Sequence, residues 1–132
     1  SYHLLFISVI LQKKNNTNFE IWGTGRAYRE FMYSEDVGKV ATWALENYKG
    51  FEPLIVSPDE EISIATIAQE IAWRMEFDGN IVYTGGLDGQ LKKPSDNRTF
   101  KTLSEEFEFT PIEEGLQKSI DWFVENYEEC RK

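Results

Sequence analysis

Apolar residues recur at helical spacing in three stretches of the chain, and this pattern places them on one face of a helix. The predicted helices run from about 36 to 48, from 63 to 75 and from 110 to 127. Each apolar stripe predicts a face that packs against the rest of the protein. In chain order the stripes are Val37, Val40, Ala41, Ala44, Leu45 and Tyr48; Ile64, Ile67, Ala68, Ile71, Ala72 and Met75; and Ile112, Leu116, Ile120, Phe123 and Tyr127.

Residues with hydroxyl side chains mark the predicted helix starts, because their oxygens can accept a hydrogen bond from the free N–H groups of the first turn. The third start has the most complete signal: Pro111 takes the first helical position and Glu113 completes a capping box. Gly50 is predicted to stop the first helix. The predicted caps are Ser34, Ser63 and Thr110.

Short apolar runs between these helices predict β-strands at 19–22, 30–33, 53–56 and 80–83. A short helical turn is predicted around 97–103. Because strands alternate with helices, the predicted fold class is α/β, with a small, partly parallel sheet and helices packed against it. The length of 132 residues corresponds to a single domain, in which residues 1–18 have no clear assignment.

Composition narrows the possible functions. The net charge of −9, from 14 basic and 23 acidic residues, argues against a partner with a phosphate backbone or an anionic membrane. The apolar run from Leu4 to Leu11 is far shorter than the ~18 residues that a membrane span needs. The one cysteine, Cys130, cannot form an internal disulfide, so a cytoplasmic location is predicted. The chain begins with Ser1 rather than methionine, which suggests a piece of a longer protein.

The chain lacks the usual catalytic and cofactor-binding motifs. Gly23-Thr24-Gly25 would need a third glycine at position 28 to form a dinucleotide fingerprint, and Tyr28 stands there instead. No tyrosine has a lysine four residues later, as the Tyr-x-x-x-Lys pair of short-chain reductases requires. His3 is isolated, and no group of residues has the spacing of metal ligands. We therefore predict no catalytic, cofactor-binding or metal-binding residues in this chain.

Two pairs of basic residues suggest an anion site. Arg26 and Arg29 follow a glycine turn, and Lys92 and Lys93 follow the glycine-rich loop 85–89. Trp22 stands just before the first turn, and its indole offers a flat face for stacking. Composition alone also allows a plainer interpretation, in which these charges are simply solvated.

Several separated motifs favour the anion site, because they resemble one enzyme family in the right order. They are E-I-W-G-T-G-R-A-Y-R-E-F-M-Y-S-E-D at 20–36, F-E-P-L-I-V-S at 51–57, L-D-G-Q-L-K-K at 87–93 and W-F-V-E-N-Y at 122–127. From about residue 19 onward the chain resembles the GDP-L-fucose synthases, which are extended short-chain dehydrogenase/reductases acting on nucleotide sugars. The resemblance implies the C-terminal substrate-binding part of such an enzyme, without its N-terminal Rossmann domain.

The resemblance also implies roles for individual residues. Trp22 would pack on the nucleoside, while Arg29 and Lys93 would neutralise the diphosphate of a GDP-sugar. Asp88 would accept hydrogen bonds from ligand hydroxyls or from the base edge. Arg26 would be peripheral.

The function expected from this resemblance is the GDP-sugar-binding region of an NADPH-dependent epimerase/reductase, inactive on its own. NADP(H) would be bound by the full-length enzyme and not by this chain, and the full-length enzyme would be a homodimer. One alternative is a fragment of a related enzyme that uses another nucleotide sugar. Two others are a non-catalytic nucleotide-binding or interaction module and a purely structural domain.

Overall fold

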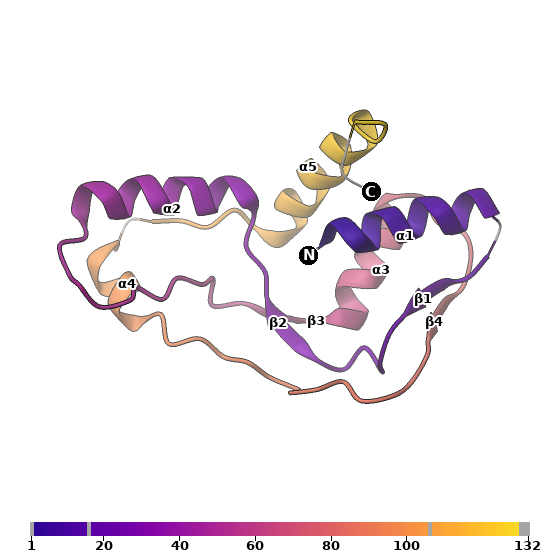
Figure 1. Cartoon of the computed structure of the whole chain (residues 1–132), viewed down its shortest axis with the longest axis horizontal. Coiled ribbons are helices and arrows are strands. Elements are labelled where there is room, and N and C mark those ends of the chain that lie inside the picture. Colours follow the sequence, from indigo (N-terminus) through magenta and orange to yellow (C-terminus); the bar gives the residue numbers. More distant parts are fainter. Residues whose placement is uncertain (1, 16, 106, 130–132) are drawn as a thin grey trace.

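The computed structural model describes residues 2–15, 17–105 and 107–129 and shows helices beside two small sheets (Figure 1). This arrangement confirms the predicted α/β class. In chain order the elements are α1 (Tyr2–Asn15), β1 (Phe19–Ile21), β2 (Tyr28–Glu30), α2 (Ser34–Asn47), β3 (Glu61–Ser63), α3 (Ile64–Arg74), β4 (Ile81–Tyr83), α4 (Arg98–Leu103) and α5 (Ile112–Glu125).

The main core lies in what we call the body, formed by α1, β1, α3, β4 and α5. Strands β1 and β4 pair in parallel, with Phe19 opposite Ile81 and Ile21 opposite Tyr83. Helix α1 contacts β1, α3 and α5, so that apolar faces from all three helices meet. The predicted stripes of α3 and α5 are confirmed. The buried core residues are Phe6, Val9, Phe19, Ile21, Ile67, Ala68, Ile71, Ala72, Leu116, Ile120 and Phe123.

A second sheet pairs β2 with β3 in antiparallel register, with Arg29 opposite Ile62. The sequence prediction was wrong about both strands. We expected a strand at 30–33, but β2 begins two residues earlier, and β3 lies outside every predicted strand. Backbone hydrogen bonds fix this register, because Ile64 N donates to the Ala27 carbonyl at 2.9 Å just beyond the paired residues.

The predicted strand at 53–56 is also wrong. Its residues are assigned no strand, and Ile55 has 49% of its surface exposed. An apolar run becomes a strand only where another strand takes up its backbone hydrogen bonds. No described strand pairs with residues 53–56.

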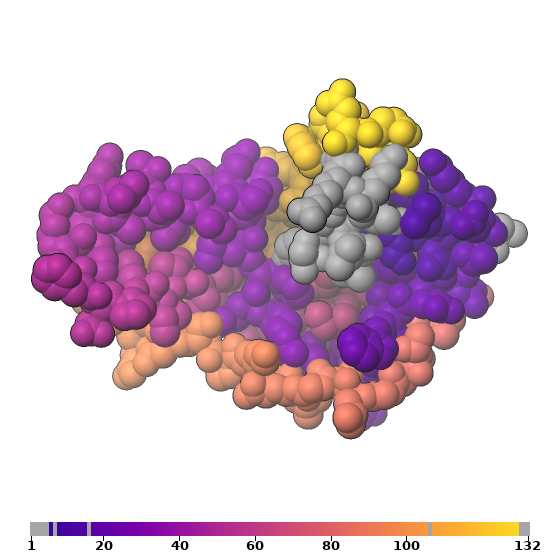
Figure 2. All heavy atoms as spheres, in the orientation of Figure 1, coloured from indigo at the N-terminus to yellow at the C-terminus, as the bar shows by residue number. Residues whose placement is uncertain are grey.

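We call residues 34–60 and 97–110 the arm, because they extend to one side of the body, on the left of Figure 2. The Phe100 ring is buried and contacts the rings of Trp43, Phe107 and Phe109 at centroid distances of 5.3, 5.6 and 6.0 Å. The apolar stripe of α2 is only partly buried, contrary to prediction. Val40 is buried, whereas Val37 is 53% and Leu45 85% exposed.

The helix caps agree with the sequence at only one of three predicted starts. The Ser63 hydroxyl accepts a hydrogen bond from Thr66 N at 3.0 Å, which confirms that cap. Ser34 is instead the first residue of α2, and Tyr33 precedes it without a side-chain cap. The predicted start at Thr110 is wrong for a different reason, which involves a buried carboxylate.

Asp36 of α2 is fully buried and holds the residue that was expected to cap α5. The Thr110 amide donates to Asp36 Oδ2 at 2.7 Å, and the Thr110 hydroxyl donates to Asp36 Oδ1 at 2.9 Å. Pro111 therefore becomes the residue before α5, and no side chain caps that helix, so the predicted capping box with Glu113 is also wrong. These bonds join α2 to the last residue of the arm, just before α5.

Helix α1 was not predicted, because residues 4–11 are apolar on all sides and show no helical periodicity. The His3 side chain and Cys130 lie outside the described residues. Within the described part of the chain, no helix combines the length and apolar character of a membrane span.

Candidate functional site

Two glycine loops meet at the carboxyl ends of the parallel strands β1 and β4. Thr84 N donates to the Ile21 carbonyl at 3.0 Å, and Gly85 N donates to the Gly23 carbonyl at 3.1 Å, which carries the pairing beyond the strands. Gly23 and Gly85 have φ values of 87° and 76°, where residues with a Cβ are strained. The carboxyl ends of parallel strands are where open α/β sheets bind ligands.

A carboxylate joins the two loops. Asp88 Oδ1 accepts a hydrogen bond from Thr24 N at 2.6 Å, and Asp88 Oδ2 accepts one from the Thr24 hydroxyl. These hydrogen bonds lower the pKa of Asp88, and the nearby guanidinium groups of Arg26 and Arg29 lower it further. A Cβ at Gly23 would lie 2.5 Å from Asp88 Oδ1, so the contact requires glycine there.

Trp22 lies directly beside this junction and is almost fully exposed, with 86% of its surface open to solvent. Its Nε1 atom lies 3.9 Å from the position that a Cβ on Gly86 would occupy. The indole therefore lies next to the second glycine loop. An exposed tryptophan contributes little to folding but offers a stacking surface for a planar ligand.

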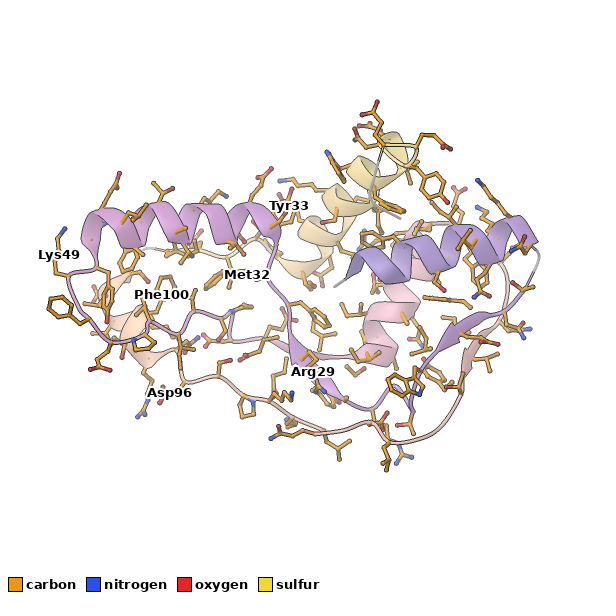
Figure 3. All side chains as sticks on the ribbon, in the orientation of Figure 1. Arg29, Met32, Tyr33, Lys49, Asp96 and Phe100 are labelled. Carbon is orange, nitrogen blue, oxygen red and sulfur yellow. The ribbon has the colours of Figure 1, made fainter. Side chains whose placement is uncertain are left out.

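Arg29 reaches the same loop from β2, near the middle of the molecule (Figure 3). Its Nη1 atom donates to the Tyr28 carbonyl at 2.5 Å and to the Gln90 carbonyl at 3.0 Å. Among the described residues, no acceptor takes a hydrogen bond from Arg29 Nε or Nη2. Part of a guanidinium with five N–H donors is thus held in place, and the rest can receive an anion.

The two lysines after the loop differ in their surroundings. Lys92 Nζ lies 3.2 Å from Glu61 Oε2 and 5.1 Å from the centre of the Tyr28 ring, so its charge is balanced within the protein. Lys93 is exposed and has no ion pair with any described residue. Of the two, Lys93 is the one whose ammonium group remains available.

The structure thus gathers three predicted residues around the 85–90 loop, with Trp22 beside Gly86, Asp88 on Thr24 and Arg29 on Gln90. Lys93 follows on the same segment, three residues after Gln90. Sequence reasoning missed Thr24, whose hydroxyl and amide hold Asp88. A hydroxyl residue between two glycines was the available signal, because its exposed amide suits a carboxylate.

A groove with a volume of about 670 Å³ lies elsewhere, between the β2–α2 connection and α5. Phe31, Met32, Tyr33 and Leu116 contribute to its walls, and none of the four predicted site residues lines it. No cluster of potential metal ligands occurs among the residues that the structure describes.

Fold and site together define an α/β domain whose glycine loops, at the carboxyl ends of parallel strands, carry cations and an exposed indole. Residues 3–57 match the model of the NAD dependent epimerase/dehydratase family. The whole chain is 41% identical to the GDP-L-fucose synthase of Dictyostelium discoideum, and 90% of it is 36% identical to the probable GDP-L-fucose synthase of Drosophila melanogaster. The chain therefore resembles the NAD dependent epimerase/dehydratase family, and the relatives it matches are named GDP-L-fucose synthases, which confirms the resemblance that the sequence motifs predicted.

Structural comparison agrees with this assignment. The crystal structure of a GDP-L-fucose synthetase from Naegleria fowleri bound to NADP matches 97% of the chain, with a TM-score of 0.94 and 37% identity. The chain spans less than half of these proteins: 45% of the Dictyostelium protein, 38% of the Drosophila protein and 41% of the Naegleria chain.

Proposed function

We propose that this chain is the GDP-sugar-binding part of a longer GDP-L-fucose synthase-like enzyme, an NADPH-dependent epimerase/reductase acting on GDP-4-keto-6-deoxy-mannose. One observation carries the proposal: Arg29 is anchored by one nitrogen to Gln90 and keeps unused donors, while the exposed indole of Trp22 lies next to Gly86 of the same loop. The names of the relatives at 41% and 36% identity supply the ligand class.

In the proposed complex the nucleoside stacks on Trp22 and the diphosphate contacts Arg29 and Lys93. A guanidinium fork matches the geometry of phosphate oxygens, and the lysine adds a point charge. These cations matter in a chain of net charge −9, because the remaining surface repels an anionic ligand.

Asp88 is proposed to accept hydrogen bonds from ligand hydroxyls or from the base. Thr24 already bonds both carboxylate oxygens. An ionised carboxylate has about four lone-pair positions, so acceptor capacity remains. An aspartate is ionised at neutral pH, as this role requires, and the bonds from Thr24 lower the pKa of Asp88 further.

The chemistry is proposed to take place on the rest of the longer protein. The residues of this chain do not fit NADP(H), because the sequence has no dinucleotide turn and no Tyr-x-x-x-Lys pair. We expect the purified chain to leave NADPH unconsumed in the presence of GDP-4-keto-6-deoxy-mannose, as followed by nicotinamide absorbance. Steady consumption that survives repurification would show that the active site is misplaced.

The exposed apolar surface of the arm is consistent with a binding part that belongs to a longer enzyme. Its exposed apolar residues Val37, Leu45 and Ile55 would be covered in the longer protein. A homodimeric longer enzyme and a cytoplasmic location remain parts of the proposal.

The test is calorimetric titration of GDP. Arg29→Ala should weaken binding by about 1.5–3 kcal/mol, because it removes charge-assisted hydrogen bonds. Arg29→Lys should recover only part of that loss, since a point charge replaces a fork. Lys118→Ala is the control, because Lys118 is an exposed cation that pairs with Glu114 on α5, outside the site. Equal affinity of wild type and Arg29→Ala would remove Arg29 from the site and favour a structural or interaction module.

A further inference from the structure

Two glutamates face each other on the second sheet, where like charges should repel. Glu30 of β2 lies directly opposite Glu61 of β3 in the antiparallel register. Like charges at such positions destabilise a sheet unless other groups balance them. Neither residue belongs to the proposed ligand contacts, so the pair calls for another explanation.

Most of the balancing groups come from the segment that carries Lys93. The Ser95 hydroxyl donates to Glu30 Oε2 at 2.5 Å, and the Ser95 amide donates to Glu30 Oε1 at 3.4 Å. Lys92 Nζ lies 3.2 Å from Glu61 Oε2. The two carboxylates therefore bind the residues that flank Lys93 and Pro94 in the sequence.

Further contacts hold both ends of the segment 91–97. At its start, Tyr28 N donates to the Leu91 carbonyl at 2.7 Å. At its end, Asn97 Nδ2 donates to the Ser57 carbonyl at 2.8 Å and to Asp59 Oδ1 at 3.0 Å. Ser57 in turn donates to Glu30 Oε1 at 3.4 Å. Glu30 therefore contacts Ser95 directly and is linked to Asn97 through Ser57.

The segment would otherwise have little to order it. Residues 91–97 form no helix or strand, and every residue from Leu91 to Asp96 is exposed. A surface loop with few apolar contacts opens at low cost in free energy. Pro94 restricts the backbone next to Lys93, but only contacts with the sheet can place the segment against the site.

We propose that Glu30 and Glu61 are positioning residues, which hold segment 91–97 on the β2–β3 sheet and thereby keep the Lys93 ammonium at the anion site. This inference rests on the proposed function, since it assigns Lys93 a diphosphate ligand. Lys92 then acts as an anchor, and its neighbour Lys93 acts as the ligand contact.

The first measurement is hydrogen–deuterium exchange of the backbone amides in segment 91–97. Glu30→Ala and Ser95→Ala remove the same contact from opposite sides, and both should speed exchange at residues 92–97 several-fold. Ser95→Ala leaves the strand intact and serves if Glu30→Ala folds poorly. Glu20→Ala is the matched control, because Glu20 is an exposed strand glutamate of β1 away from the segment. Unchanged exchange in both variants would overturn the anchoring role.

The second measurement asks whether the anchor acts through Lys93. Glu30→Ala and Ser95→Ala should each weaken GDP binding about threefold to tenfold in the wild-type background and have no further effect in a Lys93→Ala background. An equal loss in both backgrounds would overturn the positioning role, because the glutamate would then act by another route. If wild-type protein binds no GDP, the proposed function fails and the role of Lys93 fails with it, while the exchange experiment still decides whether Glu30 holds the segment.

Discussion

The body and the arm differ in how far their apolar residues are covered. In the body, the stripes predicted for α3 and α5 are buried, with Ile71 and Leu116 at 0% and 2% exposure. In the arm, the stripe of α2 buries Val40 but leaves Leu45 at 85% exposure. Because the sequence pattern is equally regular in both regions, the difference lies in what surrounds each helix. Among the described residues, no element covers the side of α2 that carries Leu45.

The comparison can be tested with one substitution made in both regions. Leu116→Ala should lower the free energy of unfolding by about 2–5 kcal/mol, because it leaves a cavity in the core. Leu45→Ala should change it by less than about 0.5 kcal/mol, as is usual for exposed positions. Urea denaturation of the two variants gives both values. A large loss for Leu45→Ala would show that α2 is already covered in solution.

The sequence predicted the body better than the arm for a physical reason. The stripes of α3 and α5 meet partners on the same chain, so their periodicity corresponds to burial. The run at 53–56 has the composition of a strand but lacks a described pairing strand, so its prediction failed. An apolar pattern therefore predicts burial correctly only where another element of the fold covers that face.

In the site, too, the sequence pattern could not predict contacts between residues that are distant along the chain. Motifs located Trp22, Arg29, Asp88 and Lys93, and the structure places three of them around one loop. The bonds from Thr24 to Asp88 and from Arg29 to Gln90 join residues 64 and 61 positions apart. Local spacing cannot indicate such contacts, because they depend on the parallel pairing of β1 with β4.

Asp36 provides a second test of the arm, since it joins the two segments of the arm next to the start of α5. Asp36→Asn should cost about 1.5–3 kcal/mol of stability, because it weakens charge-assisted hydrogen bonds from Thr110. Lys39→Ala is the control: Lys39 pairs with the same carboxylate but is largely exposed, so its loss should cost at most about 1 kcal/mol. Similar costs for the two variants would mean that the buried contact with Thr110 contributes little.

The pH dependence of stability sharpens this test. Burial by itself would raise the pKa of Asp36, but hydrogen bonds from Thr110 and Lys39 outweigh burial and leave the pKa below its ordinary value. A carboxyl group with a lowered folded pKa stabilises the protein above its unfolded pKa, near 4, and this contribution is lost as the pH falls further. Between about pH 5 and pH 3, wild type should therefore lose stability more steeply than Asp36→Asn. Parallel curves would contradict the lowered pKa.

Two glycines give the smallest expected effects, with opposite signs in the two regions. Gly23→Ala should destabilise by about 1–2 kcal/mol, because φ is 87° and the new Cβ would meet Asp88. Gly38 lies inside α2 with open space around it, so Gly38→Ala should stabilise by about 0.5–1 kcal/mol. Thermal unfolding of both variants measures these changes. A stabilising Gly23→Ala would show that the loop does not need its left-handed turn.

The central claim is that the loops beside β1 and β4 bind the nucleotide of a GDP-sugar. Competition among GDP, UDP and dTDP at equal concentration tests it most directly, with intrinsic tryptophan fluorescence or calorimetry as the readout. If Trp22 and Asp88 contact the base and its sugar, GDP should outcompete both other diphosphates, and Trp22→Ala should reduce its advantage. Equal binding of all three would reduce the site to a diphosphate cradle, and a preference for UDP would contradict the assignment to a GDP-sugar.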